Sequence, residues 1–311
     1  MKKVICLLIA FSMMFAFFAC SSSENVEEPD IRFEMFKELS ELYNGKHLTS
    51  YLEAASLSTV SFDFSSCVWD GLLKTPGDNA KEISEYLISY YFLKKSRCDV
   101  SAYAIDAYVE RLKTFVRQIN SISTSDLAKA SIALDLMNAE FDRKTVCDSL
   151  LERQDSVKWS FYDYPQTGTE SAPTSISVTA EVLTAYMSLR NYVSTAEYED
   201  CLHDNALVCL GNAIGSDNAV ADDTLKPASY MTSRLLSALI AAEIPLDGEI
   251  STAMLKALRK FSLKNGEKLT GYGMYLNSDV DKTVLPDVLF CVVCTLYGNP
   301  LIQIPEEPFG A

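Results

Sequence analysis

The chain has 311 residues, of which 48% are apolar, and it carries 42 acidic against 27 basic side chains, for a formal net charge of −15. This apolar content is normal for a folded chain and excludes wholesale disorder, while the length allows one large domain or two small ones. The acidic balance argues against nucleic-acid binding, which needs a basic face for the phosphates. Only two histidines are present, which leaves little scope for histidine-based metal or catalytic chemistry.

The N-terminus has the pattern of an export signal. A short basic segment, Met1–Lys3, is followed by an apolar run over residues 4–19 and then by Cys20. This run is shorter than the roughly 20 residues that a membrane-spanning helix needs. Phe17-Phe18-Ala19-Cys20 resembles the lipobox of bacterial lipoproteins, although Phe17 stands where Leu is usual. We therefore expect residues 1–19 to be a signal peptide and Cys20 to carry lipid, with a plain secretory signal as the alternative.

Residues 20–30 are polar and acidic, and this composition is typical of a flexible tether. Polar residues directly after a lipobox cysteine resemble a signal for sorting to the outer membrane. Acidic residues soon after the cysteine resemble the signal by which some Gram-negative phyla export lipoproteins to the cell surface. The resemblance implies an outer-membrane lipoprotein anchored by its acyl chains, because an acidic chain is not attracted to anionic lipid.

Seven cysteines remain if Cys6 leaves with the signal and Cys20 is lipidated, and an odd number cannot all pair with one another. Cys201 and Cys209 lie eight residues apart on one predicted helix, which separates them by roughly 12 Å, beyond disulfide reach. The CxxC segment 291–294 lies within an apolar run and has no second CxxC nearby. We predict that its two thiols are buried and that disulfides do not staple this fold.

Helical periodicity dominates from residue 31 onward. One clear series recurs in steps of three and four residues at Ile83, Tyr86, Leu87, Tyr90 and Tyr91. Strand-like alternation appears only in residues 60–64, which is too short to define a sheet. The sequence therefore predicts an all-α domain over residues 31–303, followed by a C-terminal tail over residues 304–311.

Four apolar segments rich in small residues recur about every 50 residues. They begin at Leu127, Val178, Met231 and Pro286, at offsets of 51, 53 and 55 residues. The first three precede more polar helices, predicted over residues 143–154, 195–214 and 250–263, and an earlier pair is predicted over residues 82–94 and 101–119. Helix pairs at a fixed period indicate stacked units that bury their inner helices against one another. An open solenoid and a closed ring both produce this pattern.

The ends of these repeats carry a family resemblance. Gln154 and Trp159 match the ends of a Gln…Gly…Trp motif, with Val157 in place of the glycine, and residues 264–273 provide an Asn-Gly-containing loop. This pattern resembles the α/α toroids of terpenoid cyclases and protein prenyltransferases. The helix sequence over residues 233–242 is also similar to the inner helices of the cobalamin-carrying transcobalamin and intrinsic factor proteins. The resemblance covers residues 80–300 and implies an α/α toroid-like array of helix pairs.

The residues that perform chemistry in those families are missing. Terpenoid cyclases use an Asp-x-Asp-Asp acid, for which only Asp222-Asp223 and Asp279-Val280-Asp281 come near, and neither His47 nor His203 matches a prenyltransferase zinc ligand. Residues 277–283 have calcium-loop spacing without the turn glycine or the terminal acid. We therefore predict no metal and no cofactor. The sequence favours a non-enzymatic protein but leaves the question open.

Two alternatives stay open. An inverting glycan hydrolase or lyase on an α/α barrel needs only two carboxylates that face each other across a cleft. Glu170, Glu181, Asp223 and Asp287 are candidate acids, but the sequence does not show which of them pair. The second alternative, a corrinoid-binding lipoprotein, is implied by the similarity to transcobalamin.

Two aromatic loops are the candidate binding site. One holds Trp159, Tyr162 and Tyr164, and the other, two repeats later, holds Tyr272 and Tyr275. End-of-repeat loops of a toroid gather at one rim, where such rings could stack on a glycan, a small molecule or a protein partner. The alternative is that the rings cover the end of the ring as core. We expect a cell-envelope lipoprotein that binds a ligand through this rim.

Overall fold

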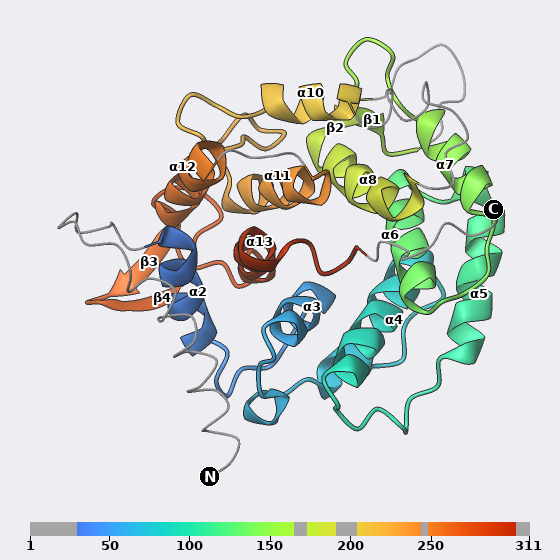
Figure 1. Cartoon of the computed structure of the whole chain (residues 1–311), viewed down its shortest axis with the longest axis horizontal. Helices are drawn as coiled ribbons and strands as arrows, with labels where there is room; N and C mark the ends of the chain where they lie inside the picture. The colour runs from blue at the N-terminus through green and yellow to red at the C-terminus, as the bar shows by residue number, and fades with distance from the viewer. Residues whose placement is uncertain (1–29, 165–172, 191–203, 244–247, 303–311) are drawn as a thin grey trace, which may run out of the picture. The chain divides into compact units, whose positions relative to one another are not determined.

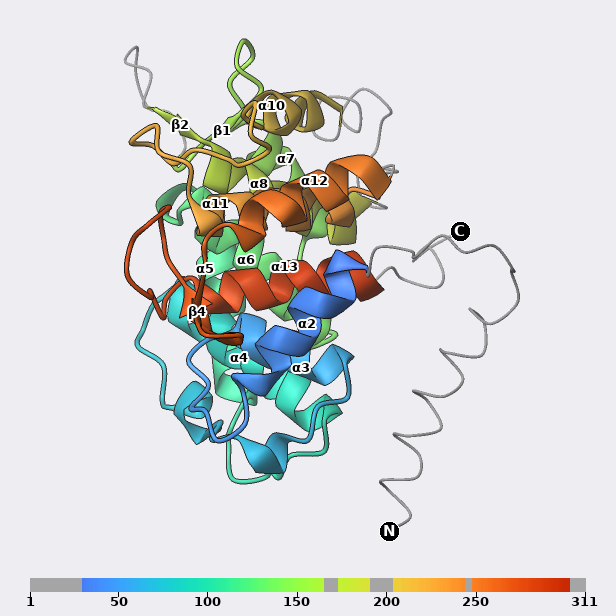
Figure 2. The same cartoon turned by 90° about the vertical axis from the view of Figure 1, so that its left-hand side faces the viewer.

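A computed structural model describes residues 30–164, 173–190, 204–243 and 248–302 (Figures 1 and 2). The contacts divide the chain into residues 1–30 and a helical unit that begins at Ile31. The prediction of a mostly helical chain is confirmed. Cys20, the predicted signal peptide, most of the tether and the tail lie outside the described residues. Within the described ranges, no helix is both long enough and apolar enough to cross a bilayer.

An inner set of helices contains the apolar repeats. Its members are α3 (Tyr51–Thr59), α4 (Ala80–Lys95), α6 (Thr124–Leu136), α8 (Ile176–Leu189), α11 (Ser229–Ala241) and α13 (Leu285–Tyr297). Each contacts the next in this order, and α13 contacts α3, so the series of contacts closes on itself. The same order can be followed around Figure 1.

A second set of helices lies outside the first. It comprises α2 (Ile31–Glu41), α5 (Asp106–Arg117), α7 (Arg143–Leu151), α10 (Ala206–Asn212) and α12 (Gly248–Arg259). Helix α5 contacts α4 and α6, α7 contacts α6 and α8, α10 contacts α8 and α11, and α12 contacts α11 and α13, while α2 contacts α13 and α12. The division follows composition: ten of the sixteen residues of α4 are buried, but only two of the twelve residues of α5. An amphipathic helix buries one stripe, whereas a helix that is apolar on most sides is enclosed.

Small residues allow the inner helices to lie close together. In α6, Ala128, Ala130 and Ala133 are completely buried, and the distance between packed helices depends on the side chains at the contact. Buried serines of these helices bond to their own backbone, as Ser84 does to the Ala80 carbonyl and Ser237 to the Ser233 carbonyl. Their hydroxyls therefore enter the core with a hydrogen-bond partner.

The structure differs from the predicted boundaries at three places. The helix predicted over residues 250–263 ends at Arg259, and β3 (Ser262–Asn265) pairs with β4 (Lys268–Tyr272) in an antiparallel hairpin. The Asn-Gly loop is the turn of this hairpin, where Gly266 has φ +64° and so favours a two-residue turn. The helix predicted over residues 101–119 begins only at Asp106, and the one predicted over residues 143–154 ends at Leu151.

The remaining elements are short. Residues 60–64 alternate like a strand but lead into a 3₁₀ helix, η1 (Phe64–Ser66), because Ser61 at φ 55° turns the chain back on itself. The other 3₁₀ helices are η2 (Asp70–Leu73) and η3 (Ile119–Ser121), and β1 (Phe161–Tyr162) pairs with β2 (Thr174–Ser175). These elements connect helices and form no larger sheet in the described ranges.

The cysteines of the described ranges are free thiols. Cys291 and Cys294 are buried on α13, as predicted for the CxxC segment. Burial raises the pKa of Cys291 to about 12, so this thiol stays protonated and acts as a small apolar group. Cys201 lies outside the described residues.

Candidate functional site

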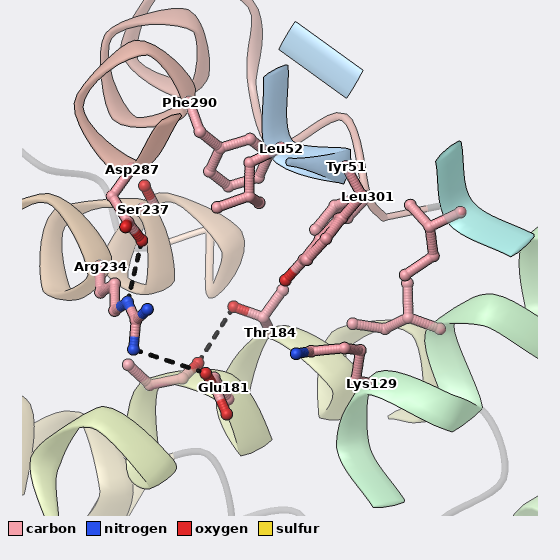
Figure 3. Close-up of a pocket in the computed structure, with 13 residues that line it drawn as sticks. Tyr51, Leu52, Lys129, Glu181, Thr184, Arg234, Ser237, Asp287, Phe290 and Leu301 are labelled. Atoms are coloured by element: carbon pink, nitrogen blue, oxygen red, sulfur yellow. Dashed lines mark hydrogen bonds and ion pairs between the residues drawn. The ribbon is translucent and has the colours of Figure 1, made fainter. Parts of the chain in front are cut away.

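All six inner helices contribute to one central pocket, which has a volume of about 80 Å³ (Figure 3). Its charged side chains are Lys129 on α6, Glu181 on α8, Arg234 on α11 and Asp287 on α13. Its other walls include Tyr51, Leu52, Ile88, Ile132, Phe290 and Leu301. Leu301 comes from the segment after α13, which runs toward α6 in Figure 1. The pocket therefore combines charged groups with an apolar lining, as ligand sites in proteins usually do.

Arg234 joins three helices. Its Nε donates to Asp287 Oδ1 at 2.9 Å, and its Nη1 donates to Ser177 Oγ on α8 at 2.8 Å. The same Nη1 lies 3.7 Å from Glu181 Oε1, so the guanidinium stands between the two carboxylates (Figure 3). Burial by itself lowers the pKa of Arg234, but Asp287 and Glu181 outweigh it and raise the pKa above its ordinary value. This cation is therefore a fixed charge of the pocket.

Lys129 is the second cation. Its Nζ donates to Glu85 Oε1 on α4 at 2.8 Å and lies 5.4 Å from the centre of the Tyr51 ring. Burial favours the neutral amine, but the negative ends of Tyr51, Glu85 and Glu181 outweigh it and raise the pKa of Lys129. Burial also raises the pKa of Tyr51 to about 12, so its hydroxyl stays protonated at neutral pH.

The two carboxylates of the pocket differ in their surroundings. Asp287 is only 8% exposed, and burial raises its pKa although Arg234 acts in the opposite direction. The side chain of Glu181 is 30% exposed, yet its Oε2 atom is sealed from solvent and has no hydrogen-bond partner within the described part of the chain. One oxygen that faces the interior of the ring is therefore left unsatisfied.

Sequence reasoning named Glu181 and Asp287 as candidate acids but could not pair them, and it missed Lys129 and Arg234. A signal for all four was present. They follow one another at intervals of 52, 53 and 53 residues, one in each apolar helix of the repeat. A charge at the same position of successive buried helices points into the interior of the array, because each repeat occupies an equivalent place.

The other candidate acids lie elsewhere. Asp223 is exposed in the loop before α11, and Glu170 lies outside the described residues. In the calcium-like segment, Asp281 Oδ1 accepts bonds from the Thr283 amide at 2.8 Å and hydroxyl at 2.6 Å. Among the residues that the structure describes, no group of three or more His, Cys, Asp or Glu side chains is placed to hold a metal ion. His47 forms a backbone bridge with Val68, and His203 falls in an undescribed range.

The predicted aromatic loops lie at the N-terminal ends of inner helices. The first loop contacts the start of α6, where Thr124 Oγ1 donates to the Tyr162 carbonyl at 2.6 Å, and approaches α8 through a bond from the Phe161 amide to Thr179. The second loop contacts the start of α11, where the Ser229 amide donates to the Met274 carbonyl. Each loop thus adjoins helices that line the pocket.

The aromatic side chains themselves have different environments. Tyr272 is completely buried, so it forms core and offers no surface to a ligand. The hydroxyls of Tyr162 and Tyr275 already donate to carboxylates of their own region, to Asp155 Oδ2 at 2.5 Å and to Asp222 Oδ2 at 2.6 Å. Trp159 is half-buried and Tyr164 is 56% exposed. Trp159, Tyr162, Tyr164 and Tyr275 therefore keep at least part of their surface open.

The match to the Gln…Trp motif has a local structural role. Gln154 Nε2 donates to the Trp159 carbonyl at 3.1 Å, and Trp159 adopts φ 61°. The amide side chain thus holds the loop that follows α7. A search for related proteins gives no further guide: no family model matches the chain, and no curated protein is significantly similar to it.

Proposed function

We propose that this chain is a cell-envelope lipoprotein that binds a small polar ligand in the central pocket of an α/α toroid, without catalysing a reaction. One observation carries the proposal. Four charged side chains, from four successive inner helices, surround a single cavity. Charges placed in a protein interior are costly unless they are paired or serve a site, and this set lies at the point where all the inner helices meet.

The closed series of helix contacts supports the toroid. In an open solenoid each repeat touches only its neighbours, so the first and last inner helices stay apart. Here α13 contacts α3, and α12 contacts α2. The inner and outer division and the Gln154 bond to the loop after α7 also agree with the resemblance to the terpenoid cyclase and prenyltransferase toroids.

The dimensions of the pocket limit its ligand. A cavity of roughly 150 Å³ accepts a molecule the size of benzene, so a pocket of about 80 Å³ takes only a small chemical group. The Arg234 and Glu181 side chains are 37% and 30% exposed, which gives this group access from solvent. A corrin macrocycle is far too large to be enclosed here, so the pocket gives the corrinoid alternative no support.

The rim loops are placed to contact the rest of such a ligand. The Tyr230 ring, at the start of α11, lies 5.6 Å from the Arg234 guanidinium carbon. In the other loop, burial and the nearby charges of Asp126 and Glu181 raise the pKa of Asp163. Both loops thus reach the neighbourhood of the pocket, which supports Trp159, Tyr162, Tyr164 and Tyr275 as additional contact residues.

A glycan hydrolase or lyase remains the second candidate because of one observation. Glu181 and Asp287 share the pocket, and burial raises the pKa of Asp287, as is typical of a general acid. Arg234 lies between the two carboxylates, however, and occupies the space that an inverting mechanism reserves for water and substrate. This arrangement favours binding over catalysis.

The test is an equilibrium binding screen of the purified protein against monosaccharides, oligosaccharides, small amines, small acids and cobalamins, run beside a turnover assay. The key variant is Thr184→Phe, which fills the pocket from α8. Thr114→Phe on α5 is its matched control, because both threonines are half-buried and bond to the carbonyl four residues earlier.

The proposal predicts a compound that binds wild-type protein and Thr114→Phe equally but loses about tenfold or more affinity for Thr184→Phe, the effect of losing about 1.4 kcal/mol. Turnover of a glycan that is abolished by both Asp287→Asn and Glu181→Gln would establish the enzymatic candidate instead.

A further inference from the structure

The charged groups around the pocket do not balance. Lys129 is paired with Glu85 at 2.8 Å, and Arg234 is paired with Asp287 at 2.9 Å. Glu181 is the fifth charge, and no cation is assigned to it within hydrogen-bond distance. The five groups together carry a net charge of −1, located on a side chain that lines the cavity.

The environment of Glu181 shows what is missing. Its Oε1 lies 3.7 Å from Arg234 Nη1, longer than the 2.7–3.2 Å or so of an N–H···O hydrogen bond. That nitrogen donates to Ser177 Oγ instead. Its Oε2 has neither solvent nor a donor in the described chain. A carboxylate oxygen in this position is unfavourable until a donor reaches it.

We propose that Glu181 recognises a primary ammonium group, so that the ligand of the central pocket is a small amine. This inference rests on the proposed binding function. An ammonium supplies several N–H donors and the positive charge that the pocket lacks. Its compact size suits a cavity of about 80 Å³, and the Phe290 and Tyr51 rings provide apolar walls of the kind that favour a cation near aromatic faces.

Other ligand chemistries fit less well. A carboxylate or phosphate would add negative charge beside Glu181 and Asp287, while both pocket cations already have carboxylate partners. A hydroxyl donates to Glu181 but leaves the net charge in place. A quaternary ammonium has the charge without an N–H donor. Ethylammonium, acetate, ethanol and tetramethylammonium therefore separate these possibilities.

The experiment is a ligand-observed NMR titration of the full chain at pH 7 with each of these four probes. We expect ethylammonium to bind at least about tenfold more tightly than the other three, since charge-assisted hydrogen bonds are the strong ones. Glucosamine, an amine on a larger body, is added to separate alkylamine from amino-sugar ligands. Glu181→Gln keeps the shape of the side chain and should weaken ethylammonium binding by about tenfold or more.

Glu243→Gln is the matched control, because Glu243 forms an ion pair with Arg190 at 3.1 Å and does not line the pocket. It should leave the affinity unchanged. Equal ethylammonium binding by wild type and Glu181→Gln would overturn the inference. The comparison of probes on wild-type protein decides the matter even if Glu181→Gln fails to fold.

The failure of the inference and that of the proposed function are distinguishable. If acetate or ethanol binds and is displaced by Thr184→Phe while ethylammonium does not bind, the ammonium inference is wrong and ligand binding in the pocket stands. If no probe binds and the wider screen also finds no compound sensitive to Thr184→Phe, both are wrong.

Discussion

Arg153 is buried without a carboxylate partner at hydrogen-bond distance in the described chain. Its guanidinium donates to the Ile119 carbonyl at 2.6 Å, the Ile122 carbonyl at 3.1 Å and Thr124 Oγ1 at 3.3 Å. Burial lowers the pKa of Arg153 to about 10, which still leaves it charged at neutral pH. The side chain satisfies carbonyls that precede α6 and so attaches the end of α7 to the start of the next inner helix.

Replacing this cation should therefore be costly. We expect Arg153→Met to lower the free energy of unfolding by about 3 kcal/mol or more, because three buried acceptors lose a charged donor. Arg190→Met removes a more exposed arginine that pairs with Glu243, and should cost less than about 1 kcal/mol. Urea denaturation followed by circular dichroism measures both. Equal costs would show that the Arg153 bonds contribute nothing special.

Residue patterns revealed some of the pocket but not its pairings. Glu181 and Asp287 could be singled out as acids, and the charge in each apolar repeat was visible in the sequence. The bond between Arg234 and Asp287 spans 53 residues, and that between Lys129 and Glu85 spans 44. Such pairings depend on which helices become neighbours and on how each is rotated, which local periodicity does not specify.

At the scale of elements, Asp222 and Tyr275 connect two loops beside α11. Asp222 Oδ2 accepts from the Tyr275 hydroxyl at 2.6 Å, and its Oδ1 accepts from the Thr224 amide and hydroxyl at 2.8 and 2.7 Å. Bonds to its charged form, first that from Tyr275, lower the pKa of Asp222 to about 2 from an ordinary 3.8. The carboxylate thus fixes the loop of residues 222–228 against the loop that carries Tyr275.

A pH dependence follows from that shift. Because the pKa of Asp222 is lower in the folded chain than in the unfolded one, its stabilisation is complete above about pH 4 and is lost as pH falls toward 2. We expect Asp222→Asn to remove up to about 2 kcal/mol of the acid-induced loss, at about 1.4 kcal/mol per pKa unit.

Thermal unfolding between pH 5 and pH 2.5 measures this difference. Tyr275→Phe should act in the same direction. Asp281→Asn removes a similar local cap, on Thr283, but no tyrosine contact, and is the control. Identical pH profiles for wild type and Asp222→Asn would contradict this account of the loops.

Helix type and approximate position could be predicted, while several ends could not. The apolar periodicity of α4, α6, α8, α11 and α13 is strong because these helices are enclosed on most sides. The β3–β4 hairpin was missed because Phe261 and Leu263 also fit the periodicity of the preceding helix. Its turn residue Gly266 was noted, but as part of a family motif and not as a hairpin signal.

At the scale of the whole helical unit, the first and last repeats are joined by charge pairs. Arg259 of α12 contacts Glu34 at 2.5 Å and Glu38 at 3.3 Å on α2, and Lys264 of β3 contacts Glu38 at 2.5 Å. More than 220 residues separate these partners. They can meet only if the array of helices closes.

A double-mutant cycle tests this closure. For Glu34→Gln and Arg259→Met we expect a coupling free energy of about 0.5–1 kcal/mol, the range of partly exposed ion pairs. Urea denaturation of the wild type, both single variants and the double variant provides it. Glu110→Gln in place of Glu34→Gln should show no coupling to Arg259. A value of zero for both cycles would favour an open solenoid.

The membrane anchor is a property of the complete chain. We expect a radiolabelled fatty acid to be incorporated into wild-type protein in Gram-negative cells and not into Cys20→Ala, because that thiol is the acceptor in the resembled lipobox. Cys98→Ala, which removes another free thiol, is the control and should retain the label. Labelling that persists in Cys20→Ala would contradict lipidation at this site.

The most direct test of the central claim is a crystal structure of the protein with the tightest compound from the binding screen. The account predicts a polar group of that compound in the cavity formed by the inner helices, within hydrogen-bond distance of Glu181. A compound bound only elsewhere, with the cavity still lined by Lys129, Arg234 and Asp287 but holding water alone, would contradict it.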